Sequence, residues 1–221
     1  MKSLKVNRIV KYMVLSDLVF WLGWGLIGPV FAIFILDHIE GGNAMIVGFA
    51  TAVYWVTKSV LRVPIGMLLD AHRGERDDYW FMTGGLFMAS LVPFGYVYAT
   101  QPVHLYLLEV VHAIAMAMSL SGWSAIFSRH LDKGSEATEF GLDATSVGLG
   151  TGISAALGGW AVTHFTFQQV FIATGFFGLV GAFLLLFLRE DVEAAIVLSF
   201  KSPFGFMKKI KKVFVREKII K

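Results

Sequence analysis

The chain has 221 residues, of which 56% are hydrophobic and only 16% are charged, and its mean hydropathy is +0.68. Soluble domains of this length carry more charge, so the composition indicates a membrane protein. The sequence contains no cysteine, which excludes disulfides, thiolate metal sites and cysteine nucleophiles. The net charge of +3 does not indicate a nucleic-acid partner, because the basic residues gather at one predicted membrane face, where anionic lipid headgroups attract them.

Six apolar stretches follow one another along the chain, and each is long enough to cross a bilayer. A membrane-spanning helix needs about 20 apolar residues. The connections between the stretches are too short to hold a soluble domain, so function must lie within the helix bundle or on its loops. The sequence therefore predicts an all-α membrane protein with six transmembrane helices. The stretches are residues 9–36, 44–69, 80–99, 103–127, 140–165 and 169–188.

Lysine and arginine occupy only alternate connections between these stretches. The first, third and fifth connections contain neither residue. By the positive-inside rule both termini are expected on the cytoplasmic side, and we expect the host membrane to be the inner membrane of a prokaryote. The basic residues on that side include Lys2, Lys5, Arg8, Lys11, Arg73, Arg76, Arg129, Lys133 and Arg189.

The second and fifth stretches, and the third and sixth, share residues at nearly constant offsets. Two units of about 9–99 and 103–188 are therefore predicted, and because three crossings is an odd number, the units would be inverted, as in many secondary transporters. Chance similarity among glycine- and phenylalanine-rich helices is the alternative. The matches include Gly48 with Gly141 and Gly66 with Gly159 at an offset of 93 residues, and Gly85 with Gly175 at an offset of 90.

The end of the second stretch carries a motif in which Gly66 and Asp70 are followed by Arg73, Gly74 and Arg76. It resembles the signature loop of the major facilitator superfamily, although Gly74 comes one residue later than in the family pattern. In this interpretation Gly66 permits the close approach of a neighbouring helix. Asp70 would pair with an arginine or face the N-terminus of a helix, and Gly74 would make the turn.

The fifth stretch carries a second motif of small residues, at Gly150, Ser154, Ala155, Gly158 and Gly159. This motif resembles a glycine-rich pattern associated with exchangers in the same family, with serine and alanine in place of a glycine and a proline. The two resemblances implicate these glycines and the signature loop in conformational change. They also imply half of a facilitator fold, similar to the N-terminal half of a member with two six-helix halves.

Charges inside membrane spans are costly and usually face the interior of the bundle, and five ionisable residues in the predicted spans are candidates for function. Asp17 and Arg62 lie at similar depth, so we expect them to pair or to share a water-filled vestibule. Asp17, Glu109 and His112 are candidates for carrying protons or recognising substrate charge. The alternative for Lys58 and Arg62 is snorkelling to the cytoplasmic headgroups. The alternative for Glu109 is an acid at the outer interface that is open to water, and for His112 it is a structural imidazole. The five are Asp17, Lys58, Arg62, Glu109 and His112.

Three tryptophans, Trp21, Trp24 and Trp123, lie on the first and fourth stretches. These stretches line the substrate cavity in the family that the chain resembles. Aromatic walls suit an amphipathic or apolar substrate. Simple packing of the three indole rings within the bundle is the alternative.

Residues 191–221 follow the sixth stretch without forming another span. Apolar residues recur there at helical spacing and alternate with lysines, which predicts an amphipathic helix in the cytoplasmic headgroup layer. This basic tail would anchor a self-sufficient six-helix protein or begin a linker to a further segment.

The leading hypothesis for function is a half-size secondary transporter of a small molecule, acting as a homodimer by alternating access. Its expected partners are the substrate, membrane lipid and a second six-helix half, without cofactor, metal or nucleic acid. A non-transporting scaffold and one half of a heteromeric transporter are the alternatives. A serine protease using Ser121 and His164 is disfavoured, because His164 is expected at the outer end of the bundle, away from Ser121.

Overall fold

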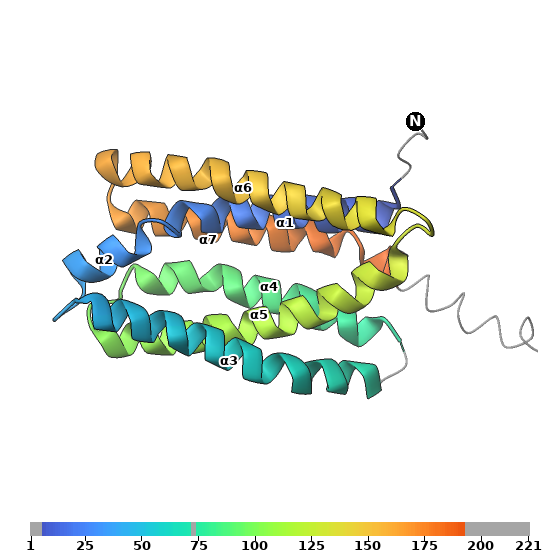
Figure 1. Cartoon of the computed structure of the whole chain (residues 1–221), viewed down its shortest axis with the longest axis horizontal. Helices are drawn as coiled ribbons and strands as arrows, with labels where there is room; N and C mark the ends of the chain where they lie inside the picture. The colour runs from blue at the N-terminus through green and yellow to red at the C-terminus, as the bar shows by residue number, and fades with distance from the viewer. Residues whose placement is uncertain (1–5, 72–73, 193–221) are drawn as a thin grey trace, which may run out of the picture.

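The computed structural model describes residues 6–71 and 74–192, and every regular element in that part of the chain is a helix. Figure 1 shows the long helices running roughly along the long axis of the molecule. The predicted tail helix and Arg73 lie outside the described residues. In chain order the helices are α1 (Arg8–Ile27), α2 (Phe31–His38), α3 (Ala44–Ala71), α4 (Arg76–Tyr96), α5 (Pro102–His130), α6 (Glu136–His164) and α7 (Phe167–Leu186).

The first predicted span is divided into two helices, so the expectation of one continuous helix over residues 9–36 is wrong. α1 ends at Ile27, and α2 begins at Phe31 after a turn that contains Gly28 and Pro29. Proline has no backbone N–H to donate and therefore interrupts the helical hydrogen-bond pattern. The Val30 amide instead donates to the Ile27 carbonyl at 2.9 Å, which closes the turn.

Four helical stretches in the described part of the chain are long and apolar enough to cross a membrane. α4 and α6 are also long, but glycine and polar residues reduce their apolar character. Four of the six predicted spans are thus supported by length and composition, and the six-span arrangement stays a prediction. The four stretches are Arg8–His38, Ala44–Ala71, Pro102–His130 and Phe167–Val192.

The six long helices of the described chain form a core of four, α1, α4, α5 and α7, with α3 at one edge and α6 at the other. α1 packs against α6 and α7, α5 packs against α3 and α4, and α4 packs against α7. α3 and α6 each have one main neighbour, and Figure 1 shows them along opposite edges of the bundle. The two edge helices are therefore the least enclosed of the long helices.

Neighbouring helices approach each other most closely at glycine. Between α1 and α7, a Cβ on Gly23 would lie 2.9 Å from the Thr174 carbonyl oxygen. Between α4 and α5, a Cβ on Gly85 would lie 2.5 Å from the Ser119 amide nitrogen. Between α1 and α6, a Cβ on Gly158 would overlap the carbonyl of Leu26. These backbones are in contact because glycine has no side chain to hold them apart.

Hydroxyl groups reinforce the contact between α1 and α7. The Ser16 hydroxyl donates to the Gly181 carbonyl at 2.8 Å, and the Thr174 hydroxyl donates to the Gly23 carbonyl at 3.0 Å. Both hydroxyl-bearing residues are fully buried. Such bonds satisfy polar groups that would otherwise be buried among apolar side chains without a hydrogen-bond partner.

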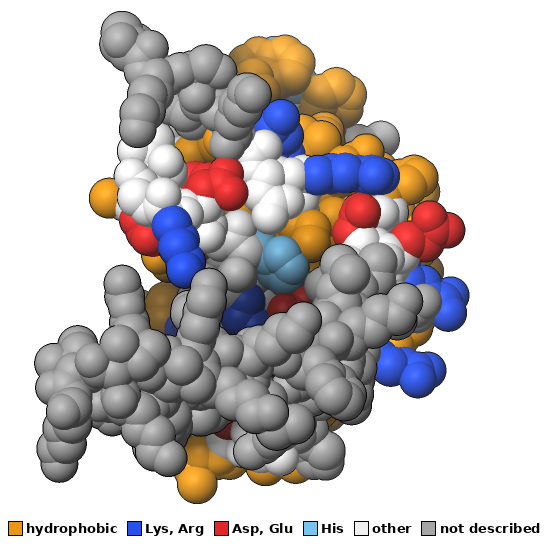
Figure 2. All heavy atoms as spheres, turned by 90° about the vertical axis from the view of Figure 1, so that its right-hand side faces the viewer, with side chains coloured by type: hydrophobic (Ala, Val, Ile, Leu, Met, Phe, Trp, Pro, Cys, Tyr) orange, Lys and Arg blue, Asp and Glu red, His pale blue; other side chains and the backbone are white. Residues whose placement is uncertain are grey.

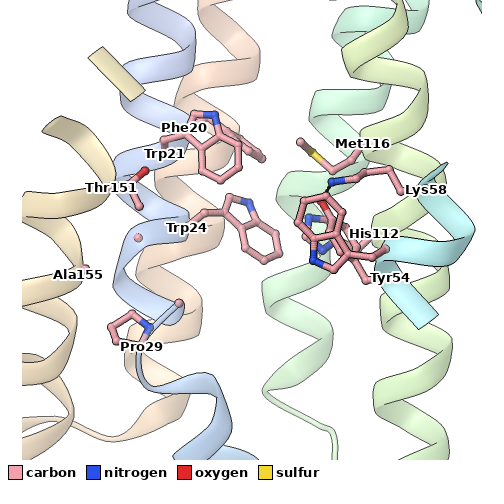
Figure 3. A pocket seen from close by; sticks show the side chains of 13 residues that line it. Phe20, Trp21, Trp24, Pro29, Tyr54, Lys58, His112, Met116, Thr151 and Ala155 are labelled. Atoms are coloured by element: carbon pink, nitrogen blue, oxygen red, sulfur yellow. Dashed lines mark hydrogen bonds between the residues drawn. The ribbon is translucent and has the colours of Figure 1, made fainter. Parts of the chain in front are cut away.

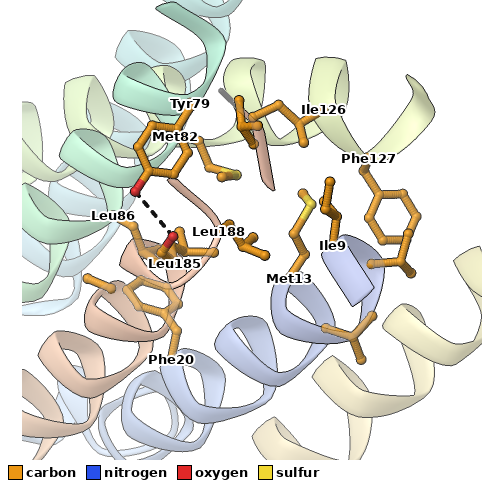
Figure 4. Packing of buried hydrophobic residues seen from close by; sticks show 14 of the residues in the cluster. Ile9, Met13, Phe20, Tyr79, Met82, Leu86, Ile126, Phe127, Leu185 and Leu188 are labelled. Atoms are coloured by element: carbon orange, nitrogen blue, oxygen red, sulfur yellow. Dashed lines mark hydrogen bonds between the residues drawn. The ribbon is translucent and has the colours of Figure 1, made fainter. Parts of the chain in front are cut away.

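Apolar side chains from α1, α4, α5 and α7 fill the space between these helices. Figure 4 shows Met13 and Phe20 of α1 facing Met82 of α4 and Leu185 of α7. The Tyr79 hydroxyl reaches across this cluster and donates to the Leu185 carbonyl at 3.2 Å. The cluster therefore joins the four core helices near the end of the bundle where α1 begins.

Charged side chains gather at that same end, which Figure 2 faces. Asp78 is completely buried at the start of α4 and forms an ion pair with Arg129 at the end of α5. Arg8 lies 3.5 Å from Asp191, which links the beginning of α1 to the segment after α7. The connections that carry the basic residues of the sequence thus lie at one end of the bundle, as far as the structure describes them.

We predict that Gly158→Ala lowers the thermal stability of the full chain in nanodiscs, whereas Gly159→Ala does not. At Gly158 the added methyl group meets the α1 backbone, and overpacking of this kind costs about 1–3 kcal/mol. At Gly159 no described atom lies within 4 Å of the added Cβ, and alanine favours a helix by about 1 kcal/mol over glycine. Equal losses of melting temperature in the two variants would contradict the close approach of α6 to α1.

Candidate functional site

A cavity of about 460 Å³ lies between the two edge helices and the core. Its wall is made by residues of α1, α3, α5 and α6, together with the turn after α1. Figure 3 shows the ring of Trp24 on α1 reaching toward Tyr54 and His112 on the opposite wall. The volume falls within the range of about 300–1,000 Å³ that is usual for small-molecule sites. The lining residues are Phe20, Trp21, Trp24, Gly25, Gly28, Pro29, Tyr54, Trp55, Lys58, His112, Met116, Thr151 and Ala155.

Aromatic rings dominate this wall, and three of them form a stack. The His112 ring lies 4.0 Å from the Trp24 ring at an interplanar angle of 9°, and 4.6 Å from the Tyr54 ring at 29°. His112 is thereby held between a ring from α1 and a ring from α3. The stack links the two sides of the cavity through side chains whose flat faces suit an aromatic ligand.

Lys58 places its ammonium group among the rings of the α3 wall. The nitrogen donates to the Tyr54 hydroxyl at 3.1 Å and lies 3.5 Å from the centre of the Trp55 ring. Only 8% of the residue is exposed, and the ammonium group lies against aromatic rings of its own helix. Cation–π attraction holds the ammonium group inside the cavity wall.

Glu109 and His112 share a face of α5, as their spacing predicted. One carboxylate oxygen of Glu109 accepts a hydrogen bond from Tyr96 at 2.9 Å, and the other lies 3.8 Å from Nδ1 of His112. Glu109 is 6% exposed, so it is a buried acid rather than one open to water. Its position behind His112 orients the imidazole that lines the cavity.

Asp17 does not pair with Arg62, contrary to expectation, because α1 and α3 are not packed together. The Asp17 carboxyl interacts instead with the Asp143 carboxyl of α6 and the Trp123 indole of α5. Arg62 is exposed and reaches the Ser124 hydroxyl at 3.4 Å. Asp143 was not among the candidates predicted from the sequence, although an aspartate in the first turn of the fifth predicted span is a signal that the sequence does contain.

Trp123 does not line the cavity, unlike Trp21 and Trp24. Its ring stacks on Phe127 at 4.4 Å, with an interplanar angle of 13°. Its indole nitrogen is buried without a hydrogen bond of standard geometry, as is one carboxylate oxygen of Asp143. The packing alternative therefore describes Trp123 better than a place in the cavity wall.

The residues of the signature loop are only loosely connected to the rest of the described chain. Gly74 has a φ of 154°, a conformation that favours glycine, and Arg76 begins α4. Asp70 is exposed and interacts electrostatically with the ion pair formed by the buried Asp78 and the exposed Arg129. No described atom lies within 4 Å of a Cβ on Gly66, so the expected close approach is not made by another described helix.

The small-residue motif of α6 has a more definite role in packing. A Cβ on Gly150 would lie 3.1 Å from the Leu18 carbonyl oxygen, and one on Gly158 would overlap the Leu26 carbonyl. The Ser154 hydroxyl between them donates to the Gly150 carbonyl at 2.7 Å. These positions form the face of α6 that packs on α1, whereas Gly159 faces away from it.

The short connection between α5 and α6 is tied down by two glutamates. The Glu136 carboxylate accepts from the Gly134 amide at 2.9 Å, and hydrogen bonds from its own amide and that of Gly134 lower its pKa. Glu139 accepts from the Asp132 amide at 3.2 Å, but burial raises its pKa. The link therefore fixes where α6 begins relative to α5.

Other chemistries find little support in the described residues. No group of three histidine, cysteine, aspartate or glutamate side chains there is arranged to hold a metal ion. The Ser121 hydroxyl donates to the Arg62 carbonyl at 3.4 Å, while His164 contacts Thr163 and Trp160 at the far end of α6. The pair required for a serine protease is not assembled.

The chain belongs to the Major Facilitator Superfamily, because the profile of that family matches residues 13–220. Together with its apolar helices, this makes it an integral membrane protein. Over 219 residues it is 26% identical to a protein of Buchnera aphidicola subsp. Schizaphis graminum (strain Sg) named "Uncharacterized transporter". The alignment covers 97% of this chain and 54% of the relative, so the chain spans about half the length of the curated relative that it matches.

Proposed function

We propose that the chain is one half of a secondary transporter for a small molecule, and that two six-helix halves, here two copies of the chain, work by alternating access. The observation that carries the proposal is the aromatic cavity lined by α1, α3, α5 and α6. Secondary transporters keep their substrate sites where repeated units meet, near the middle of the membrane. The name of the Buchnera relative supports transport as the activity.

The proposed arrangement is an inverted repeat in which α1, α3 and α4 correspond to α5, α6 and α7. Under this exchange the packing of α1 on α6 becomes that of α5 on α3, and the packing of α1 on α7 becomes that of α5 on α4. The contact of α4 with α7 maps onto itself. The main contacts of the bundle therefore have the symmetry that a three-plus-three repeat requires.

The edge helices offer matching surfaces for the second half. On α3, a stripe of small residues recurs at helical spacing along one face, and residues 93 positions later form the same stripe on α6. No described atom lies within 4 Å of a Cβ on any glycine of the two stripes. Small residues allow membrane helices to pack closely, so the stripes suit contact with another helix pair. They are Gly48, Ala52, Ser59 and Gly66 on α3, and Gly141, Thr145, Gly152 and Gly159 on α6.

The end of the bundle shown in Figure 2 is proposed to face the cytoplasm. It holds the start of α1, the α3–α4 and α5–α6 connections and the end of α7, which Figure 1 shows on one side. These are the basic connections of the sequence, and basic connections remain on the cytoplasmic side. The cavity would then open alternately to this side and to the opposite one.

Single cysteines in the cavity wall test alternating access, and the cysteine-free sequence supplies the background. Thr151→Cys and Ala155→Cys should each react with a membrane-impermeant maleimide added from either side of oriented vesicles, because both residues line the cavity. Ala89→Cys, at a fully buried position in α4, serves as the control and should react from neither side. Labelling of the cavity positions from one side alone would reject alternating access.

Asp17 is the proposed coupling residue, and the same assay tests it. In a single-cysteine cavity variant that keeps Asp17, the ratio of labelling from the two sides should change several-fold between pH 6 and pH 8, because protonation of Asp17 would bias one conformation. Taking the ratio cancels the effect of pH on the thiol itself. Asp17→Asn should make the ratio independent of pH, whereas Asp37→Asn, at an exposed position in the last turn of α2, should leave the response intact. An unchanged response in Asp17→Asn would remove this residue from coupling.

The mass of the full chain in nanodiscs, corrected for lipid, tests the pairing of two halves. We expect twice the mass of a 24.4 kDa chain. Gly152→Leu, which fills the open stripe on α6, should shift the protein toward the mass of one chain. A native protein of single-chain mass would reject the homodimer and favour a separate second half or a non-transporting scaffold.

A further inference from the structure

Lys58 is a buried cation that faces the cavity without an anionic partner among the described residues. None of the ion pairs formed in that part of the chain includes it. Its neighbours are the Tyr54 hydroxyl and the Trp55 ring, which offset part of the cost of burial but carry no charge. A buried charge is normally balanced by an opposite charge.

The acids of the neighbouring helices are engaged elsewhere. Glu109 directs its two oxygens at Tyr96 and His112, and it does not line the cavity. Asp17 interacts with Asp143 and Trp123, and neither aspartate lines the cavity. The described cavity wall therefore presents a positive charge without a carboxylate to neutralise it.

The remainder of the wall is apolar and flat. Trp21 and Trp24 line it from α1, Trp55 from α3 and Met116 from α5. Figure 3 shows the Trp24 ring facing the group of rings around Lys58. Aromatic walls of this kind also attract cations. Here, however, the Lys58 ammonium already covers the Trp55 ring and would repel a second cation.

We infer that the cavity binds an amphipathic organic anion, with its acid group at Lys58 and its flat apolar body against the tryptophan rings. The inference rests on the proposed transport function and names its substrate class. An ammonium–carboxylate contact in a site of low polarity would supply both affinity and a preference for negative charge. A lipid phosphate has the same charge, and the experiment separates it from a soluble acid.

Three naphthalene compounds of similar size test the charge preference of the full chain in phosphatidylcholine nanodiscs. The first is tritiated 1-naphthoate, whose binding is measured directly. The other two are unlabelled 1-naphthamide and 1-naphthylmethylammonium, whose affinities are measured by competition with it. Empty nanodiscs correct for partition into lipid. The anion should bind at least about tenfold more tightly than the amide, and the cation more weakly still.

Variants of Lys58 and Arg62, which lie one turn apart on α3, test whether Lys58 causes the preference for the anion. Lys58→Gln should weaken naphthoate binding about tenfold or more and leave the affinity for the amide nearly unchanged. Lys58→Arg keeps the charge and should retain most of the preference. Arg62→Gln is the matched control, because Arg62 is exposed and does not line the cavity. Retention of folding is checked for each variant by thermal unfolding.

The inference fails if the amide or the cation binds as tightly as naphthoate, or if no naphthalene compound binds to the native protein. It also fails if the preference persists in Lys58→Gln, or if phosphatidylglycerol in the nanodisc abolishes naphthoate binding, which would assign the site to lipid. Labelling of the cavity from both sides would still support transport in each of these cases. Labelling from one side would reject the transport proposal independently of any ligand.

Discussion

The close approach of backbones at small residues is the constraint on which the rest of this structure depends. In a bilayer, lipid tails are as apolar as leucine, so helices gain little from hiding apolar side chains from their surroundings. They associate through packing and through polar groups that find partners across the contact. Gly23 and Gly181 join α1 to α7 in this way, Gly85 joins α4 to α5, and Gly178 meets Ser90 between α7 and α4.

The edge helix α3 is held differently from the core, and it forms one wall of the cavity. The buried hydroxyls between α1 and α7 make bonds of 2.8 and 3.0 Å. The side-chain bonds between α3 and α5, made by Arg62 with Ser124 and by Ser121 with the Arg62 carbonyl, are both 3.4 Å long. A wall made partly of weakly bonded helix is easier to displace than the core, which is what a cavity that opens in turn to two sides requires.

Hydropathy predicted where helices lie along the chain, but not which helices meet. The stretches of apolar residues correspond closely to the observed helices, apart from the turn at Gly28 and Pro29. The spacing of Glu109 and His112 correctly placed both side chains on one face, because that spacing is a property of a single helix. Asp17 and Arg62 had equal predicted depth, yet depth does not determine neighbours, and their helices are not packed together.

The same limit explains why the sequence left the orientation of Lys58 open and did not single out Asp143. A lysine within a membrane span can extend toward the headgroups or turn inward, and the choice depends on the rings offered by Tyr54 and Trp55 once the side chain is placed. Asp143 gains its significance only from Asp17, which lies 126 residues earlier in the chain. Long-range pairs of this kind have no period or spacing in a single sequence from which to predict them.

The separation of these charges bears on how coupling and substrate recognition would be combined. Lys58 lines the cavity, whereas the Asp17–Asp143 pair lies outside its wall. Phe20 and Trp21, one helical turn after Asp17 on α1, line the cavity from that part of the helix. A proton on the acid pair would therefore act on the cavity by changing how α1 sits against α6, and not by contact with the substrate. Close packing at Gly150 and Gly158 would carry that change along the two helices, because a contact between backbones leaves little room for independent movement.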